Sequence, residues 1–344
     1  MRVVVLERNA VGSGASGVNA GTLSLQIKRV ALMKYALRGH AWWREAGEAV
    51  GFHRTGGYTL AFNQREQALL ESRMKLKREA GAPIEFVTPA QVRAREPALA
   101  DRIVAASYCA DDGHADSTRT GVHLRRLLRE ASVDVREHTP VNAIDAGDAM
   151  FRVTTANAGM IAARRLLIAA GAWTKSIAGL LEVALPISTR VNTVSVTEPG
   201  RTVLTAGLGH ATGLLTLKQK DDGSFLIGGG WQGRGTPETG RGEIAGDTLR
   251  QNLQLARFTV PALARARVMR SWTGFEAFVP DHYPLAGALP GVPDAFVLAC
   301  VRGGYTIGPC IGPLVADLLL GREPELPLFD PARFTAEAMT ASAV

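Results

Sequence analysis

The chain opens with a short apolar run, Val3 to Leu6, that ends in an acidic residue, Glu7. In a Rossmann-type nucleotide-binding domain the second strand ends in this way, and its carboxylate takes the ribose hydroxyls of the cofactor. A first strand and a glycine turn normally precede that acidic residue by about 20 positions, whereas this sequence begins at Met1. The run therefore predicts a nucleotide-binding α/β domain that lacks its N-terminal strand and glycine turn.

A G-x-G-x-x-G pattern follows in Gly12 to Gly17, GSGASG. That pattern indicates a phosphate-binding turn where it directly follows a strand, opens a helix and has an acidic residue about 20 positions on. Here residues 8–11 intervene and residue 37 is a leucine. Residues 13–21 are therefore either a flexible small-residue loop or, in the better-fitting interpretation, a loop whose backbone approaches a bulky planar ligand.

The composition is typical of a soluble globular enzyme. With 46% hydrophobic and 21% charged residues, 344 positions can bury a large core. The net charge of +7 comes from scattered basic residues, so no nucleic-acid partner is expected. Cys109, Cys300 and Cys310 have no metal-ligand spacing, so neither a disulfide framework nor a metal site is expected. The sequence shows no membrane span and no secretory signal, which predicts a cytoplasmic protein.

Local patterns predict helices and strands along the whole chain. Residues 25–50 predict an amphipathic helix, Thr88 and Pro89 the start of a short one, and Asp116 or Ser117 the cap of a basic helix that ends near residue 131. Residues 166–170 predict a buried strand. Residues 186–231 alternate in the manner of strands, which indicates an antiparallel sheet that forms the floor of a substrate site.

Six segments resemble, in the same order, the D-amino-acid oxidase superfamily of FAD-dependent oxidoreductases, which contains glycine, sarcosine and opine oxidases. They are VVVLERNAVGSGASGVNAGTL (3–23), DGHAD (112–116), LLIAAGAWTKSIAGLL (166–181), GSFLIGGG (223–230), RSWTGFEAFVPDHYPLAG (270–287) and VRGGYTIGPCIGPLVADLLLG (301–321). The resemblance covers residues 1–322. It implies an α/β (α+β) fold, in which a truncated Rossmann-type FAD-binding domain is interleaved with an antiparallel-sheet substrate domain. The expected FAD-binding domain comprises residues 1–50, 110–180 and 285–330, and the substrate domain residues 51–109 and 181–284.

The resemblance also implies residues that contact a non-covalent FAD. They are Glu7, Arg8, Gly14, Ala15, Ser16, Asn19, Ala20, Gly21, Val141, Ala170, Gly171, Trp173, Gly303, Gly304, Tyr305, Thr306 and Ile307. From the residues alone, 168–173 is also compatible with an ordinary buried strand entering a glycine turn, and Val141 with an edge strand. Residues 302–308 place glycines before a helix, whose N-terminal N–H groups suit an electron-rich group such as the flavin pyrimidine edge. Residues 17 and 18 lack the histidine of a covalent flavin link.

Substrate contacts depart from the family pattern. Where amino-acid oxidases of the family carry a carboxylate-binding arginine, in a W-x-G-x-R run, this chain has Trp272-Thr273-Gly274-Phe275-Glu276. Glu276 would repel a carboxylate and would suit a cationic amine, an amide or a hydroxyl. The remaining pocket candidates are Arg190, His282, Tyr283, Arg302 and Tyr305, each of which is equally compatible with a surface or packing role. No residue is assigned as the catalytic base.

Two functions remain open at this point. The first is FAD-dependent oxidation of a C–N bond in an amino acid or secondary amine of the D-amino acid, sarcosine, opine or hydroxyproline type, with electrons passed to oxygen, a quinone or a partner subunit. The second is a fragment or partner-dependent subunit of such an oxidoreductase that does not hold FAD by itself. A nicotinamide-dependent dehydrogenase is a distant third.

Overall fold

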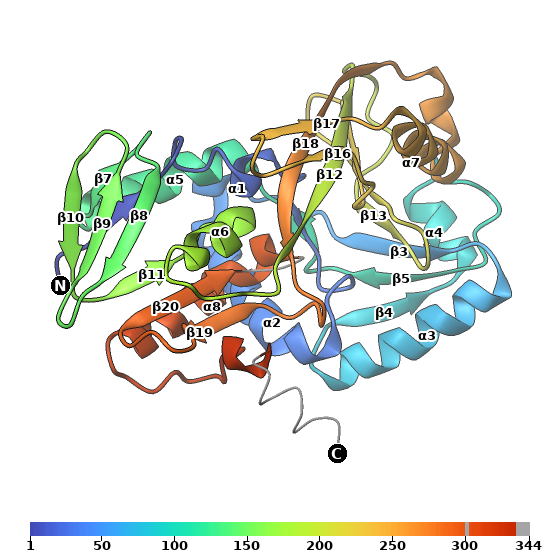
Figure 1. Ribbon diagram of the computed structural model, residues 1–344. Helices are drawn as coiled ribbons and strands as arrows, with labels where there is room; N and C mark the ends of the chain where they lie inside the picture. Colours follow the sequence, from blue (N-terminus) through green and yellow to red (C-terminus); the bar gives the residue numbers. More distant parts are fainter. Residues whose placement is uncertain (300–302, 335–344) are drawn as a thin grey trace. The chain divides into compact units, whose positions relative to one another are not determined.

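The computed structural model describes residues 1–299 and 303–334 (Figure 1). Its chain forms two compact units, each assembled from separated segments. Unit 1 comprises residues 1–17, 121–190 and 275–344, and unit 2 comprises residues 18–120 and 191–274. The sequence-based ranges assign residues 18–50 and 110–120 to the FAD-binding domain, whereas contacts place them in unit 2. The reason is that β2 (Thr22–Leu23) pairs with β6 (Gly113–His114) beside the sheet of that unit.

Unit 2 is built on an eight-stranded sheet in the order β18-β12-β15-β14-β13-β3-β5-β4. Its strands are β3 (Gly57–Ala61), β4 (Ile84–Val87), β5 (Ala105–Cys109), β12 (Ser188–Thr197), β13 (Gly207–His210), β14 (Thr216–Gln219), β15 (Phe225–Gly228) and β18 (Val268–Phe278). The chain passes between the units within β12 and β18. β3 and β13 pair in parallel, while the pairs β3–β5, β4–β5, β13–β14, β14–β15 and β12–β15 are antiparallel, in keeping with the expected antiparallel sheet.

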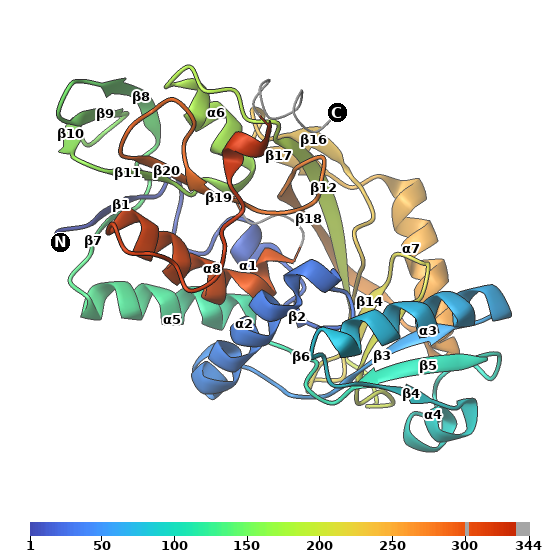
Figure 2. The same ribbon diagram turned by 90° about the horizontal axis from the view of Figure 1, so that it is seen from below.

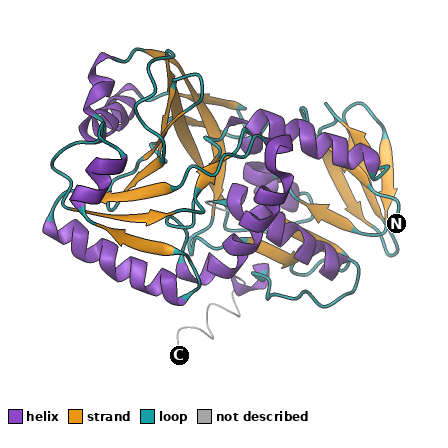
Figure 3. Ribbon diagram, turned by 180° about the vertical axis from the view of Figure 1, so that it is seen from behind, coloured by secondary structure: helices purple, strands orange, loops and turns teal. Residues whose placement is uncertain are grey.

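Three helices contact strands of this sheet: α3 (Gln64–Glu79), α4 (Pro89–Arg95) and α7 (Gly246–Thr259). Unit 2 also contains α2 (Met33–Ala46) and a small hairpin of β16 (Arg234–Thr236) and β17 (Arg241–Glu243). Figures 2 and 3 show α3 lying along β3, β4 and β5, which it contacts. Leu60, Leu208, Leu217 and Ile227 form part of one buried apolar cluster, because alternate residues of their strands point to the same face.

Unit 1 contains short sheets instead of one wide sheet. β1 (Val4–Leu6) pairs in parallel with β7 (Asp134–Arg136), and β11 (Leu166–Ile168) pairs in parallel with β20 (Ala295–Ala299), which pairs antiparallel with β19 (Leu285–Ala288). β8 (Val141–Ala146), β9 (Phe151–Thr155) and β10 (Met160–Ala163) form an antiparallel sheet. The helices are α1 (Ala15–Val18), α6 (Thr174–Gly179), α8 (Gly304–Leu319) and α5 (Ser117–Glu130), which begins in unit 2.

Several predicted helix ends are confirmed by their caps. Thr88 forms a capping box with Gln91 at the start of α4. Asp116 Oδ1 accepts the N–H groups of Thr118 and Arg119 at the start of α5, at 2.8 and 2.9 Å. Among the described residues, no helix combines the length and the apolar character that crossing a membrane requires.

The single helix predicted for residues 25–50 is wrong, because α2 begins only at Met33. The side chain of Gln26 is buried, and its Nε2 donates to the carbonyl oxygen of Gly57 at 2.7 Å. This hydrogen bond joins residues that are far apart in the sequence. It holds residues 25–28 in a turn, which the local sequence pattern does not reveal.

A buried carboxylate connects the end of α4 to the segment that leads into β13. Glu96 is 2% exposed, and its Oε1 accepts the N–H groups of Thr205 and Ala206 at 3.2 and 2.9 Å. The hydroxyl of Thr205 also donates to it. Since backbone donors buried without acceptors are costly, this carboxylate fixes the approach to β13.

We predict that Glu96→Ala lowers the free energy of unfolding by roughly 2–3 kcal/mol, because the N–H groups of Thr205 and Ala206 lose a charged acceptor. Urea unfolding followed by circular dichroism measures the change. The control is Glu85→Ala, which removes an exposed carboxylate 3.7 Å from Arg95 and should change stability by less than about 1 kcal/mol. Equal losses in the two variants would contradict a structural role for Glu96.

A pair of histidines holds β6 against the segment before β3. His53 and His114 exchange backbone hydrogen bonds of 2.8 and 3.0 Å, and their rings stack with centroids 5.2 Å apart. Burial lowers the pKa of His114 to about 3, and the positive charge of Lys218 acts in the same direction. The imidazole is therefore neutral in the folded protein above about pH 3. In the unfolded chain it becomes protonated below about pH 6.5.

Because the pKa of His114 is lower in the folded than in the unfolded state, its contribution to stability is complete above about pH 6.5 and is lost as the pH falls toward 3. We predict that His114→Gln reduces the loss of unfolding free energy between about pH 7 and pH 5 by about 2 kcal/mol. Urea unfolding at both pH values measures it. His123→Gln on α5 serves as the control, and an equal pH effect in wild type and His114→Gln would refute the assignment.

Candidate functional site

The end of β1 brings together two residues of the expected cofactor site. The N–H of Glu7 donates to the carbonyl oxygen of Arg136 at 2.9 Å, and Glu7 Oε1 accepts the N–H of Asn9 at 2.8 Å. The guanidinium of Arg8 lies 4.6 Å from the ring centroid of Trp173, which follows β11. The ends of β1 and β11 therefore lie near each other within unit 1.

The glycines of the loop after β1 serve two purposes. A Cβ on Gly17 would lie 1.8 Å from the carbonyl oxygen of Gly12, and one on Gly21 would lie 2.0 Å from that of Ala115, so both are required for close packing. Asn19 Oδ1 accepts the N–H of Gly21 at 2.6 Å and closes the turn between them. Gly14 faces open space, between exposed Ser13 and the exposed Ala15 and Ser16 of α1.

Other expected contacts surround β11 and α8. Gly171, after β11, also faces open space, whereas Val141 and Ala170 pack against the core of unit 1. Gly303, with φ 95°, caps α8, so residues 304–307 form the first turn of that helix. Thr306 is fully buried there, and its hydroxyl has no hydrogen-bond partner among the described residues.

These features fit a bound FAD. Open space beside Gly14 and Gly171 lets a planar ligand approach the backbone. The buried Thr306 hydroxyl offers an unused polar group at a helix N-terminus, where the positive end of the dipole favours electron-rich ligands. In the described part of the chain, no group of three or more His, Cys, Asp or Glu side chains is arranged to hold a metal ion.

Two of the substrate candidates in unit 1 gather around Phe278. The guanidinium of Arg190 lies 3.9 Å from the centroid of its ring, and His282 meets it edge-on with centroids 4.6 Å apart. Tyr283 stacks instead on Phe329, with centroids 5.8 Å apart. Glu276 lies partly buried on β18, and Tyr305 lies in the first turn of α8. Arg302 and Cys300 lie outside the described residues.

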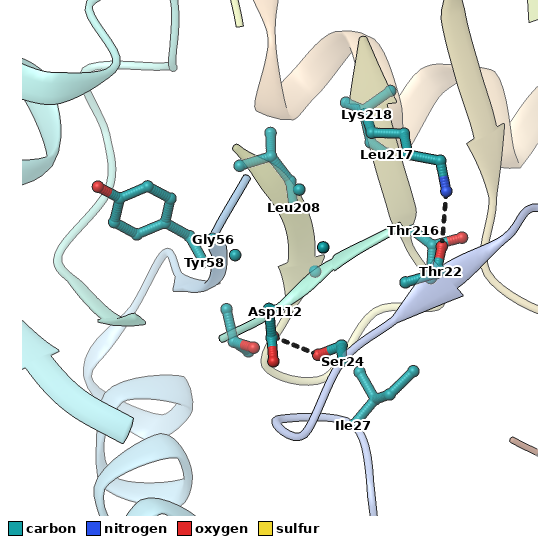
Figure 4. A pocket seen from close by; sticks show the side chains of 15 residues that line it. Thr22, Ser24, Ile27, Gly56, Tyr58, Asp112, Leu208, Thr216, Leu217 and Lys218 are labelled. Atoms are coloured by element: carbon teal, nitrogen blue, oxygen red, sulfur yellow. Dashed lines mark hydrogen bonds between the residues drawn. The ribbon is translucent and has the colours of Figure 1, made fainter. Parts of the chain in front are cut away.

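Unit 2 contains a pocket of its own, here called the Lys218 pocket. Side chains that line it include Thr22, Ser24, Tyr58, Asp112, Thr216 and Lys218, and several glycines of β3, β6 and β13 also form part of its wall. Figure 4 shows Lys218 reaching toward Thr22, and Ser24 facing Asp112. Thr22 and Ser24 directly follow Asn19, Ala20 and Gly21 of the expected cofactor loop.

The two ionisable groups of this pocket, Asp112 and Lys218, differ in their hydrogen-bond partners. Asp112 is satisfied, since it accepts hydrogen bonds from Ser24 Oγ, Leu25 N and Gln26 Nε2, although burial raises its pKa. Lys218 is 6% exposed and donates to Thr22 Oγ1 at 3.1 Å and to the carbonyl oxygen of Ala20. Burial lowers the pKa of Lys218 to about 7.

Sequence reasoning missed Lys218, Thr216 and Thr22. In Thr216-Leu217-Lys218-Gln219, alternation puts Leu217 on the core face of β14 and Thr216 and Lys218 together on the other face. The pattern therefore assigns Lys218 to a polar face, and its burial follows only from long-range contacts with Ala20 and Thr22.

Comparison with known proteins agrees with this geometry. The chain is 27% identical over 302 residues to a subunit of the opine oxidase of Agrobacterium tumefaciens (strain Ach5), covering 85% of this chain and 77% of that one. It is 27% identical over 336 residues to glycine oxidase of Geobacillus kaustophilus (strain HTA426), covering 94% and 87%. The crystal structure of glycine oxidase from Geobacillus kaustophilus shares the fold, with a TM-score of 0.87 at 24% identity over 97% of this chain and 93% of that one.

A second solved structure, L-proline dehydrogenase from P. horikoshii, has a TM-score of 0.89 at 24% identity and covers 97% of this chain and 91% of that one. The FAD dependent oxidoreductase family, DAO, matches residues 1–318. That range includes the residues around Gly14, Gly171 and Thr306 that suit the cofactor. The chain therefore belongs to the DAO family of FAD-dependent oxidoreductases.

Proposed function

We propose that this enzyme oxidises the C–N bond of an amino acid or secondary amine, of the D-amino acid, sarcosine, opine or hydroxyproline type, with non-covalent FAD as acceptor. One observation carries the proposal: the expected cofactor loop, Asn19 to Gly21, continues without interruption into Thr22 and Ser24, which line the Lys218 pocket. A small molecule in that pocket thus lies beside the loop. Relatives named opine oxidase, glycine oxidase and dimethylglycine dehydrogenase support an amine substrate.

The chain's own residues bind and orient such a substrate. Bound FAD supplies a two-electron acceptor for the hydride on the carbon next to nitrogen. The hydroxyls of Thr22 and Thr216 offer hydrogen bonds in the pocket. Glu276, where the resemblance leads one to expect an arginine, favours a cationic amine group over a carboxylate group in its vicinity.

Reduction of the FAD-loaded protein by candidate substrates tests this function. Under anaerobic conditions, loss of flavin absorbance is expected with glycine, sarcosine, D-proline or an opine, because each offers a C–N bond, and not with a 2-hydroxy acid such as lactate. Production of the matching oxo acid and amine confirms C–N cleavage. Faster reduction by lactate than by every amine would reject the proposal.

We predict that Glu276→Arg raises kcat/KM for glycine, D-proline and sarcosine, relative to their uncharged carboxamides, by about tenfold or more, because a bidentate cation replaces a repelling carboxylate. Steady-state kinetics on the three acids and their carboxamides measure the ratio. Glu243→Arg, at an exposed position of β17, is the control for added charge. An unchanged preference in Glu276→Arg removes Glu276 from the substrate site.

A second candidate function, that of a partner-dependent subunit, is favoured by strand edges in unit 1. Within the described residues, β1 pairs with β7 alone and β11 with β20 alone, so each has an edge without a strand neighbour. Leu167 of β11 is 40% exposed, although strands of a parallel sheet are usually buried, and Val3, directly before β1, is 37% exposed. Leu124 and Leu127 of α5 are each 38% exposed. We propose that a strand from another polypeptide segment pairs with these edges and strengthens FAD binding.

The expected result for the isolated chain is weak FAD binding that a co-expressed strand–glycine turn–helix peptide strengthens by tenfold or more, because exposed edges accept strands. Fluorescence titration of FAD measures the affinity. Leu167→Lys should abolish the gain by placing a charge in the new apolar interface, while Met160→Lys, at a 62% exposed position on β10, should retain it. Tight FAD binding that the peptide does not improve would dismiss this candidate.

A further inference from the structure

The Lys218 pocket presents a buried amino group that forms no ion pair with the described residues, although Asp112 lines the same pocket. Lys218 is 6% exposed, and the hydrogen bonds recorded for it go to two neutral oxygens, those of Ala20 and Thr22. A buried charge is costly unless an opposite charge accompanies it. The pocket therefore stabilises either a neutral amine or an ammonium group that is paired with a negatively charged ligand.

The charges around Lys218 favour an anionic ligand. Lys220, directly after the same strand, is positive, and His114 of β6 is neutral because burial and Lys218 lower its pKa to about 3. Asp112 lines the same pocket, but its two oxygens are engaged by Ser24, Leu25 and Gln26. An anion that enters this pocket thus meets one buried amino group and a carboxylate already held by other donors.

We propose that Lys218 binds the carboxylate of the substrate, becoming protonated as the carboxylate enters, so that the enzyme selects amines that carry a carboxylate group. This inference rests on the proposed function for the identity of the pocket's ligand. It assigns carboxylate binding to a lysine of β14, within unit 2. Lysine suits a site of this kind, because its pKa responds strongly to burial and to a nearby anion.

The pKa of Lys218, about 7 in the free protein, gives the proposal a proton signature. Below that pH the ammonium is already present, and a carboxylate binds without proton exchange. Above it each bound carboxylate must bring one proton to the amine, so the affinity falls by about tenfold per pH unit. Neither behaviour is expected from an arginine or from hydroxyl groups alone.

Binding of pyrrole-2-carboxylate to the full chain, followed by isothermal titration calorimetry, tests the proposal without turnover. At about pH 8, titrations in buffers of different ionisation enthalpy should show uptake of nearly one proton per ligand. Lys218→Met should weaken binding at least tenfold and remove the proton uptake. Lys220→Met, which removes an exposed lysine of the same segment, should preserve both. Pyrrole-2-carboxamide, which carries no charge, should bind at least tenfold more weakly than the acid.

Equal binding by wild type and Lys218→Met, or by the acid and the amide, would overturn the proposal. If Lys218→Met does not fold, NMR of the reductively methylated wild-type lysines decides: one amine should titrate near pH 7, and its pKa should rise when pyrrole-2-carboxylate is added. Absence of such an amine also overturns it. A loss of kcat in Lys218→Met with unchanged carboxylate affinity would point instead to a proton-accepting role. Carboxylate binding without any amine oxidation would retain this site and reject only the proposed function.

Discussion

The hydrogen bonds of Asp112 hold the pocket side of unit 2 in place. Its carboxylate accepts hydrogen bonds from Ser24, Leu25 and Gln26. The side chain of Gln26 also donates to the carbonyl oxygen of Gly57 on β3. Ser107 of β5 donates to Gln26 as well. A segment without regular secondary structure is thereby fixed against the large sheet. The expected cofactor loop that precedes it, and the pocket wall that it forms, both depend on this anchor.

Much of the fold followed from the sequence because it depends on local chemistry. The caps at Thr88 and Asp116 are read from short-range patterns, and the antiparallel sheet of unit 2 from alternation in residues 186–231. The start of α2 did not follow, because the contact between Gln26 and Gly57 joins residues that are distant in sequence. The Lys218 pocket was missed for the same reason: β14 meets residues 20–22 only in the folded chain.

The expected cofactor residues illustrate a further limit of sequence patterns. Gly12, Gly14, Gly17 and Gly21 look equivalent as letters, yet the structure gives them different tasks. Gly17 and Gly21 are small because carbonyl oxygens lie against them, while Gly14 leaves space that a ligand can use. A glycine pattern indicates where the backbone needs close approach by another group. The structure shows whether that group is another part of the protein or whether space remains for a ligand.

The interleaving of the two units has a consequence for synthesis of the chain. Unit 2 begins at residue 18 but is not complete until residue 274, and unit 1 needs segments from both ends of the sequence. Contacts that join distant segments form slowly, and domains fold as units during translation. Neither unit can therefore finish folding while the ribosome is still making β18. β3 and β4 pair with β5 early, but the other edge of β3 must wait for β13, so it stays unpaired until residues 207–210 have been made.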